Sequence, residues 1–202
     1  MALQNHDGVA VLTIENPPVN ALGPQSIAPL ISALETAQAD RAVTAIVLTG
    51  ANGNFSGGAD MKGFGVSPPP RPNVRDLIEV LEASAKPIVA AIDGNAMGGG
   101  LEVALGCDYR VATPGARLGL PEIKRGLLPG AGGTQRAPRL IGAAAALELI
   151  LGGEPVGGER AKAIGLVDSV AGDLLADAVA FARTLAGKPR RRVSAMIPRP
   201  DD

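Results

Sequence analysis

Two glutamates, Glu102 and Glu122, each follow a segment that turns the chain. Glu102 comes after the glycines at positions 98–100, and Glu122 follows a Leu-Pro pair. Two carboxyl groups in one site can act as general base and general acid, because burial keeps one of them protonated near neutral pH. The alternative is structural: Glu102 is then an exposed helix residue, and Glu122 a first-turn carboxylate favoured by the helix dipole.

Glycine-rich loops accompany the glutamates. Besides positions 98–100, the segment 54–62 (Asn-Phe-Ser-Gly-Gly-Ala-Asp-Met-Lys) contains two adjacent glycines. Glycine lets the backbone approach a ligand closely, and the first N–H groups of a helix have no partner within that helix. Two such loops could therefore hold one oxygen atom between backbone amides. They could equally be tight turns and helix caps, and composition alone does not separate the two.

Other residues with catalytic potential lack the partners that they need. His6 is the only histidine and lies near the N-terminus, where we expect a surface position, so neither a Ser-His-Asp triad nor a usual metal cluster is predicted. Cys107 lies in a predicted strand and is more typical of a small core residue than of a nucleophile. Residues 130–134 (Gly-Ala-Gly-Gly-Thr) resemble a phosphate loop without its Lys-Ser/Thr ending, so we expect them to open a helix beneath the site.

Alternating strands and helices must position these residues. Apolar residues recur at helical spacing in residues 24–39 and 74–85, which predict helices. The proline-rich residues 67–72 predict an exposed loop that borders the site. Together with four apolar runs, this order predicts an α/β fold with right-handed crossovers. The four runs predict strands at residues 9–15, 45–50, 86–94 and 107–112.

The second half of the chain is predicted to be richer in helix. A helix-rich stretch fills most of residues 134–151, and two more helices are predicted at 158–164 and 173–186, with a strand-like segment at 166–168. Residues 188–202 combine three successive arginines with three prolines, which is typical of a tail or truncated linker. We therefore divide the chain into a core domain at residues 1–187 and a tail at residues 188–202.

Composition excludes several classes of protein. Of 202 residues, 46% are apolar and the net charge is -1, which suits one domain with a sizeable core. No nucleic-acid partner is expected, because a basic excess and interleaved aromatic residues are missing. No membrane span is expected either, because the apolar runs are shorter than the ~20 residues that crossing a bilayer requires. A single cysteine and the lack of a basic, apolar leader predict a cytoplasmic protein.

Several motifs in a fixed order resemble one known family. Residues 54–62 and 98–102, with 120–123 (Leu-Pro-Glu-Ile) and 128–136 (Leu-Pro-Gly-Ala-Gly-Gly-Thr-Gln-Arg), are similar to motifs of the crotonase family, the enoyl-CoA hydratases and isomerases. The resemblance runs from about residue 9 to about residue 186. Residues 101–110 with 119–122 look most like the hydratase part of multifunctional fatty acid β-oxidation proteins.

The resemblance implies a crotonase-like ββα spiral core. Family members usually continue into C-terminal helices that cover the acyl pocket and, in many, build trimers. Because this sequence stops at Asp202, we expect that helical layer to be absent or truncated. The same resemblance implies a homo-oligomer, either a trimer or a hexamer.

The resemblance also implies a site. In it, Glu102 and Glu122 are catalytic, and the amides of Ala59 and Gly99 form an oxyanion hole for the thioester oxygen. One such donor is typically worth ~3 kcal/mol. We expect Glu102 to orient and deprotonate water and a protonated Glu122 to deliver a proton to the α-carbon. The residues expected to contact substrate and CoA are Ala21, Leu22, Ala59, Asp60, Met61, Lys62 and Gly99.

The implied function is enoyl-CoA hydratase, which adds water to a trans-2-enoyl-CoA in fatty acid β-oxidation. Retention of both glutamates favours hydration, because double-bond migration needs mainly one base and the family's isomerases commonly keep only the residue matching Glu122. The alternatives are an isomerase or another crotonase-type enzyme and, from a different class, a weakly active acyl-CoA-binding or assembly subunit. The expected partner is an acyl-CoA; no metal and no separate cofactor are expected, because coenzyme A is part of the substrate.

Overall fold

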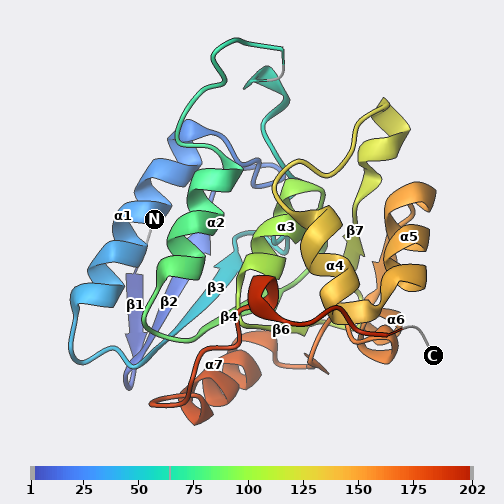
Figure 1. Cartoon of the computed structure of the whole chain (residues 1–202). Helices are drawn as coiled ribbons and strands as arrows, with labels where there is room; N and C mark the ends of the chain where they lie inside the picture. The colour runs from blue at the N-terminus through green and yellow to red at the C-terminus, as the bar shows by residue number, and fades with distance from the viewer. Residues whose placement is uncertain (1–2, 64, 201–202) are drawn as a thin grey trace.

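The computed structural model describes residues 3–63 and 65–200 (Figure 1). Residues 1–2 and 64 of the predicted core, and 201–202 of the predicted tail, lie outside these ranges. A six-stranded sheet has the order β1-β2-β3-β4-β6-β9, in which β1 is antiparallel to β2 and the other neighbours are parallel. Its strands are β1 (Leu3–His6), β2 (Val9–Ile14), β3 (Ala45–Gly50), β4 (Ile88–Ile92), β6 (Tyr109–Ala112) and β9 (Ser169–Val170).

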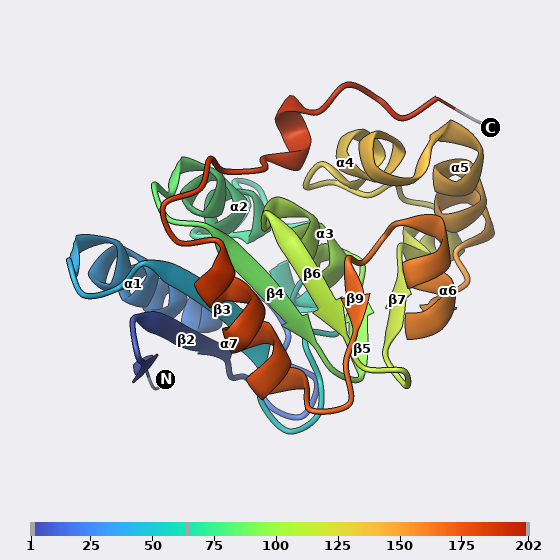
Figure 2. The same cartoon turned by 90° about the horizontal axis from the view of Figure 1, so that it is seen from below.

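Alternate residues of the central strands face two cores, because successive side chains of a strand point to opposite faces. Val9 and Val11 of β2 belong to a core that α7 (Leu174–Thr184) covers, whereas Ala10 and Leu12 belong to the larger core. Figure 2 shows α7 on the face of the sheet opposite to α1 and α2. Burial on both faces explains the nearly continuous apolar runs. The helices over the larger core are α1 (Pro24–Ala39), α2 (Val74–Ala83) and α3 (Gly99–Gly106).

A second, three-stranded sheet of the order β5-β7-β8 positions both glutamates. β5 (Asn95–Met97) leads into α3, which carries Glu102, and β7 (Arg117–Gly119) leads into the short 3-10 helix η2 (Pro121–Arg125), which carries Glu122. β5 and β7 are parallel neighbours, so the segments that follow them leave the sheet at the same edge. Sequence analysis did not predict these strands, since β5, β7 and β8 (Val156–Gly157) are too short for a periodic signal.

The bounds of the predicted helices, and of the four strands predicted from apolar runs, are confirmed to within about two residues. Two other predictions need correction. The stretch at 134–151 is two helices, α4 (Gly133–Ile141) and α5 (Ala143–Gly152), separated by Gly142, whose φ of 80° is one that residues with a side chain rarely adopt. The predicted strand at 166–168 is wrong: Leu166 and Val167 are buried in a bend after α6 (Gly158–Ile164), and the strand β9 begins one residue later.

Three arginines connect the C-terminal segment to the core. Arg190 Nε lies 2.7 Å from Oδ2 of the buried Asp108, and Arg191 Nη2 lies 2.6 Å from Asp168 Oδ1. Arg192 Nε donates to the carbonyl oxygen of Glu82 in α2 at 2.7 Å. The short 3-10 helix η3 (Val193–Ala195) follows. The domain boundary at residues 187 and 188 stays a prediction.

His6 and Cys107 lie at the surface and in the core, respectively. His6 is exposed, as expected for a surface residue, and Cys107 is 1% exposed in the core, where burial raises the pKa of its thiol to about 12. In the part of the chain that the structure describes, none of the helices combines the length and apolar character that crossing a membrane requires.

Candidate active site

Ala59 follows Gly58 in a strand-like segment that pairs with Leu22. Leu22 N donates to Gly58 O at 2.8 Å, and Asp60 N donates to Leu22 O at 2.9 Å. These two bonds use the groups on either side of Ala59 and leave its own N–H out of the pairing. Gly58 has φ +106°, and a Cβ there would lie 2.8 Å from Met97 O, so only glycine allows this close approach to β5.

Gly99 is the first residue of α3, so its N–H has no partner within the helix. The first bond of this turn runs from Glu102 N to Gly98 O at 2.9 Å. A Cβ on Gly99 would lie 3.2 Å from Ala59 N, and a Cβ on Gly98 would lie 2.9 Å from Glu122 Oε1. The backbone at Gly98 and Gly99 therefore lies next to both the amide of Ala59 and the carboxyl of Glu122. That both N–H groups point to one oxygen stays a prediction.

Glu102 is held rigidly inside the protein. It is 3% exposed, and its Oε1 accepts hydrogen bonds from Ala131 N at 2.7 Å and Gly133 N at 2.8 Å. Burial raises the pKa of Glu102, while the two amides and the positive charges of Arg136 and Arg75 oppose that increase. The expectation of an exposed helix residue, the structural alternative for Glu102, is wrong.

Glu122 is half-buried and much less constrained. Within the described residues, its Oε2 is buried without a hydrogen-bond partner. Burial raises the pKa of Glu122, and the negative charge of Glu102 adds to the increase. A buried carboxyl oxygen without a partner favours the protonated form and is available to a ligand.

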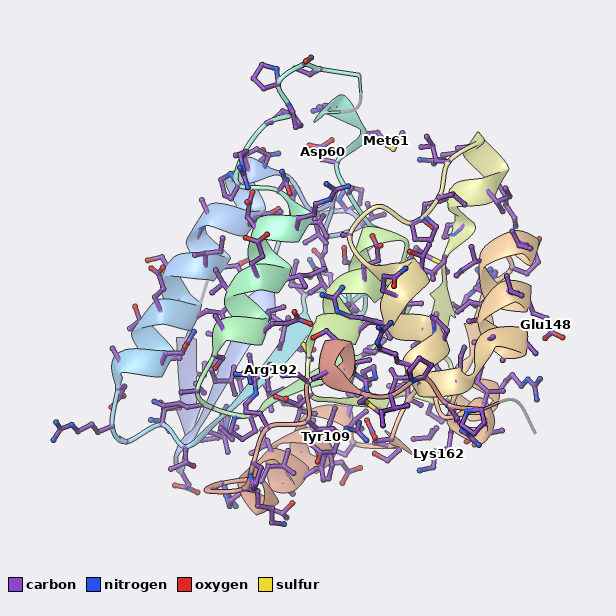
Figure 3. All side chains as sticks on the ribbon, viewed as in Figure 1. Asp60, Met61, Tyr109, Glu148, Lys162 and Arg192 are labelled. Carbon is purple, nitrogen blue, oxygen red and sulfur yellow. The ribbon has the colours of Figure 1, made fainter. Side chains whose placement is uncertain are left out.

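A cavity of about 720 Å³ joins most of the predicted site residues. Figure 3 shows Asp60 and Met61 next to each other above the sheets. Pro69 and Pro70 also line the cavity, which confirms that the proline-rich loop borders the site. The predicted residues that line it are Leu22, Ala59, Asp60, Lys62, Gly99, Glu102 and Glu122.

Two predicted contact residues are not among the described residues that line the cavity. Ala21 does not line it, and its carbonyl oxygen accepts from Asn16 Nδ2 at 2.8 Å and Ser26 Oγ at 2.9 Å. Met61 is 47% exposed, and its sulfur lies 2.8 Å from Arg125 Nη1. The structure therefore does not bring these two side chains into the cavity.

The partners of Glu102 were not predicted from the sequence. Residues 130–134 do open a helix, α4, as predicted, and the same loop supplies the amides of Ala131 and Gly133. The two glycines before the helix start were the only sequence signal for such donors. Among the described residues, no group of three or more His, Cys, Asp or Glu side chains could hold a metal ion.

Comparison with known proteins gives a consistent result. A family model described as enoyl-CoA hydratase/isomerase matches residues 4–198. The glyoxysomal fatty acid beta-oxidation multifunctional protein MFP-a of Cucumis sativus is 50% identical over 172 residues, covering 81% of this chain and 24% of that protein. The peroxisomal bifunctional enzyme of Danio rerio is 49% identical over 189 residues, covering 92% and 26%. A probable enoyl-CoA hydratase of Bacillus subtilis (strain 168) is 45% identical over 186 residues, covering 89% and 72%.

This chain thus spans about a quarter of the length of its multifunctional relatives. Their names assign them to glyoxysomes or peroxisomes, and so do not support the cytoplasmic location expected from the sequence, whereas the Bacillus relative is bacterial. The location stays a prediction.

Solved structures share the fold. An enoyl-CoA hydratase from Bacillus anthracis has a TM-score of 0.83 and 33% identity, covering 91% of this chain and 75% of that one. DspI from Pseudomonas aeruginosa has a TM-score of 0.83 and 36% identity, covering 96% and 77%. The crotonase-like α/β fold expected from the motifs is confirmed.

Proposed function

This chain belongs to the enoyl-CoA hydratase/isomerase family, and from that premise we propose that it adds water to a trans-2-enoyl-CoA, giving a 3-hydroxyacyl-CoA in fatty acid β-oxidation. One observation carries the proposal. Two carboxyl groups, Glu102 and Glu122, line one cavity together with Ala59 and Gly99. Relatives named as β-oxidation multifunctional proteins and as a probable enoyl-CoA hydratase support the reaction class.

The oxyanion step depends on the backbone. As water attacks the β-carbon, electron density moves through the α-carbon to the thioester oxygen, which becomes negatively charged. The N–H groups of Ala59 and Gly99 are available to bind that oxygen, because neither is used by the bridge to Leu22 or by α3. Donors fixed before the reaction begins stabilise the developing charge without reorganising.

The two glutamates divide the proton transfers. Glu102, whose pKa burial raises and two amide donors and two arginines hold down, takes the proton from water as the water oxygen bonds to the β-carbon. Glu122, whose environment favours the protonated form, gives its proton to the α-carbon as the enolate collapses. One proton is taken and one is delivered, so the sum is water added across the double bond.

The CoA part of the substrate is the only coenzyme that the proposal needs. Asp60 and Lys62, in the segment that follows Gly58, line the cavity together with Leu22, which pairs with Ala59 of that segment. We assign these three residues to contacts with CoA. Contacts from Ala21 and Met61 rest on the family resemblance alone. A homo-oligomer, trimer or hexamer, is likewise proposed from the resemblance.

A spectrophotometric assay tests the function. We expect the absorbance of the enoyl thioester to fall when the protein meets crotonyl-CoA, and the double variant Glu102→Gln/Glu122→Gln to bind the thioester without turnover. Binding by wild type without turnover would favour an acyl-CoA-binding or assembly subunit. Migration of a 3-enoyl double bond without hydration would favour an isomerase, for which the Glu122 carboxyl against Gly98 would supply the base.

A further inference from the structure

The loop at residues 130–133 forms a partition between two cavities. Arg75, Gly130 and Ala131 line both the active-site cavity and a second cavity of about 390 Å³ on the other side. Arg136 and Arg139 of α4 line the second cavity, together with Glu82 of α2. The loop therefore has one side toward the proposed chemistry and another toward a cluster of charged side chains.

The two sides of the loop bind different groups. Its amides, from Ala131 and Gly133, hold Glu102 Oε1 on the active-site side. Its carbonyl oxygens bind arginines: Arg136 Nη1 donates to Ala131 O at 2.9 Å, and Arg75 Nε donates to Gly130 O at 2.7 Å. Ala131 thus links the two sides, because its N–H faces Glu102 and its carbonyl accepts from Arg136.

Arg136 is the better fixed of the two arginines. It is 9% exposed, whereas Arg75 is exposed, and its Nε donates to Glu82 Oε1 at 3.0 Å. Gly132, at φ +103°, leaves room for the guanidinium, because a Cβ there would collide with Nη1 of Arg136. Arg136 reaches the Glu82 carboxylate and the Ala131 carbonyl from two different nitrogens of one planar group, a geometry that the single ammonium of lysine does not reproduce.

We propose that Arg136 is a positioning residue for the hydration reaction, which it supports by fixing the loop whose amides hold Glu102. It acts through Ala131 and is not among the described residues that line the active-site cavity. The inference rests on the proposed function of Glu102 as the base. Without Arg136 the Ala131 carbonyl loses its donor, the loop relaxes, and the carboxylate loses its fixed orientation.

The charges around Glu102 give the proposal a distinctive readout. Arg136 of α4 and Arg75 of α2 lower the pKa of Glu102, while Glu122 of η2 lies close enough for the two carboxyls to interact. Replacing Arg136 by a neutral residue removes a positive charge and weakens the amide bonds, so the pKa of Glu102 rises. The acidic limb of the kcat/KM profile then moves to higher pH, which a simple loss of folded protein would not cause.

Three variants test the proposal in hydration of crotonyl-CoA across the pH range. Arg136→Gln should lower kcat by about tenfold to about a hundredfold with little change in KM, since a misplacement of about 1 Å costs up to about 10²-fold, and should shift the acidic limb upward. Arg136→Lys should lower kcat with a smaller shift, because the charge remains. Arg139→Gln is the matched control: Arg139 lines the same cavity but bonds Gln135 O of its own helix, so its profile should match wild type.

The outcomes separate this proposal from the function itself. If wild type lacks hydration, the proposed function fails, yet the 13C resonance of the Glu102 carboxyl should still titrate at higher pH in Arg136→Gln. If wild type is active and Arg136→Gln keeps the kcat and acidic limb of Arg139→Gln, the positioning role is refuted. Should Arg136→Gln not fold, Arg136→Lys decides: wild-type kcat in that variant would equally refute the role.

Discussion

The surroundings of Glu102 and Glu122 differ sharply although both carboxyls line one cavity. Glu102 is 3% exposed on a regular helix, and two amides hold one of its oxygens. Glu122 lies half-buried in a short 3-10 helix, and its Oε2 has no hydrogen-bond partner among the described residues. One carboxyl is therefore fixed by the protein before substrate arrives, whereas the other keeps an unpartnered oxygen that the substrate can meet.

The charged and polar groups around the two carboxyls also differ. Burial raises the pKa of both carboxyls, but the opposing groups differ. For Glu102, two amides, Arg136 and Arg75 offset the cost of burying a charge. For Glu122, its own backbone amide and the positive charge of Arg125 oppose the increase in pKa, while the repulsion from Glu102 adds to it and favours a bound proton. The pair therefore suits a base and an acid, in that order.

The largest effect should come from Glu102→Gln. An amide cannot accept the proton of water, even where its carbonyl oxygen still accepts from the two N–H donors that hold Oε1, so kcat for crotonyl-CoA hydration should fall by about 10²–10⁴-fold. Steady-state kinetics measures the loss. Glu148→Gln, on the exposed surface of α5 far from the site (Figure 3), is the control and should keep wild-type kcat. A Glu102→Gln variant with near-wild-type kcat would break the comparison.

Glu122→Gln should have the next largest effect, about a 10²-fold fall in kcat, because the proton for the α-carbon is lost while water activation remains. The exchange of solvent deuterium into the α-position of product, followed by NMR, sharpens the test. It should decrease in Glu122→Gln along with hydration. Rapid α-exchange in this variant would mean that another group delivers the proton.

A third, smaller effect concerns Gly98, which separates the oxyanion segment from Glu122. Its φ is +50°, and a Cβ there would lie 2.9 Å from Glu122 Oε1. Gly98→Ala should therefore displace the carboxyl and lower kcat by about tenfold, with backbone strain of about 1–3 kcal/mol. Gly187→Ala is the matched control, since Gly187 has φ +70° with no atom within 4 Å of the added Cβ. If both variants lose stability equally and neither loses kcat, the contact between position 98 and the Glu122 carboxyl does not affect catalysis.

The same contrast explains what the sequence could predict. The bounds of α1 and β3 agreed with the sequence because their apolar periodicity is a local signal. The strands β5 and β7, only three residues each, carry no such signal, although they bring Gly99 and Glu122 to one edge. For these, only the motif resemblance placed the residues in one site.

The environment of each glutamate was the least predictable feature. The amide of Ala131 reaches Glu102 from 29 positions away, and Arg136 meets Glu82 across 54 positions. Such contacts depend on how α2, α3 and α4 pack together, which no local pattern encodes. The contacts predicted for Ala21 and Met61 stay predictions, because neighbours in a motif need not point into the same cavity.

The smallest expected effect is on stability, and it compares the carboxyls without any substrate. The pKa of Glu122 is raised on folding, so ionisation of this carboxyl destabilises the folded protein. This destabilisation is absent below the unfolded pKa and complete above the folded pKa. Glu122→Gln should therefore raise the Tm at neutral pH by about 2–4 °C, the shift that about 1 kcal/mol gives in a chain of this size, and leave it unchanged in acid. Glu102→Gln should gain less or lose stability, since it gives up charge-assisted bonds to Ala131 and Gly133. Scanning calorimetry from acid to neutral pH measures both, and equal, pH-independent shifts would show that the two environments do not differ as their contacts indicate.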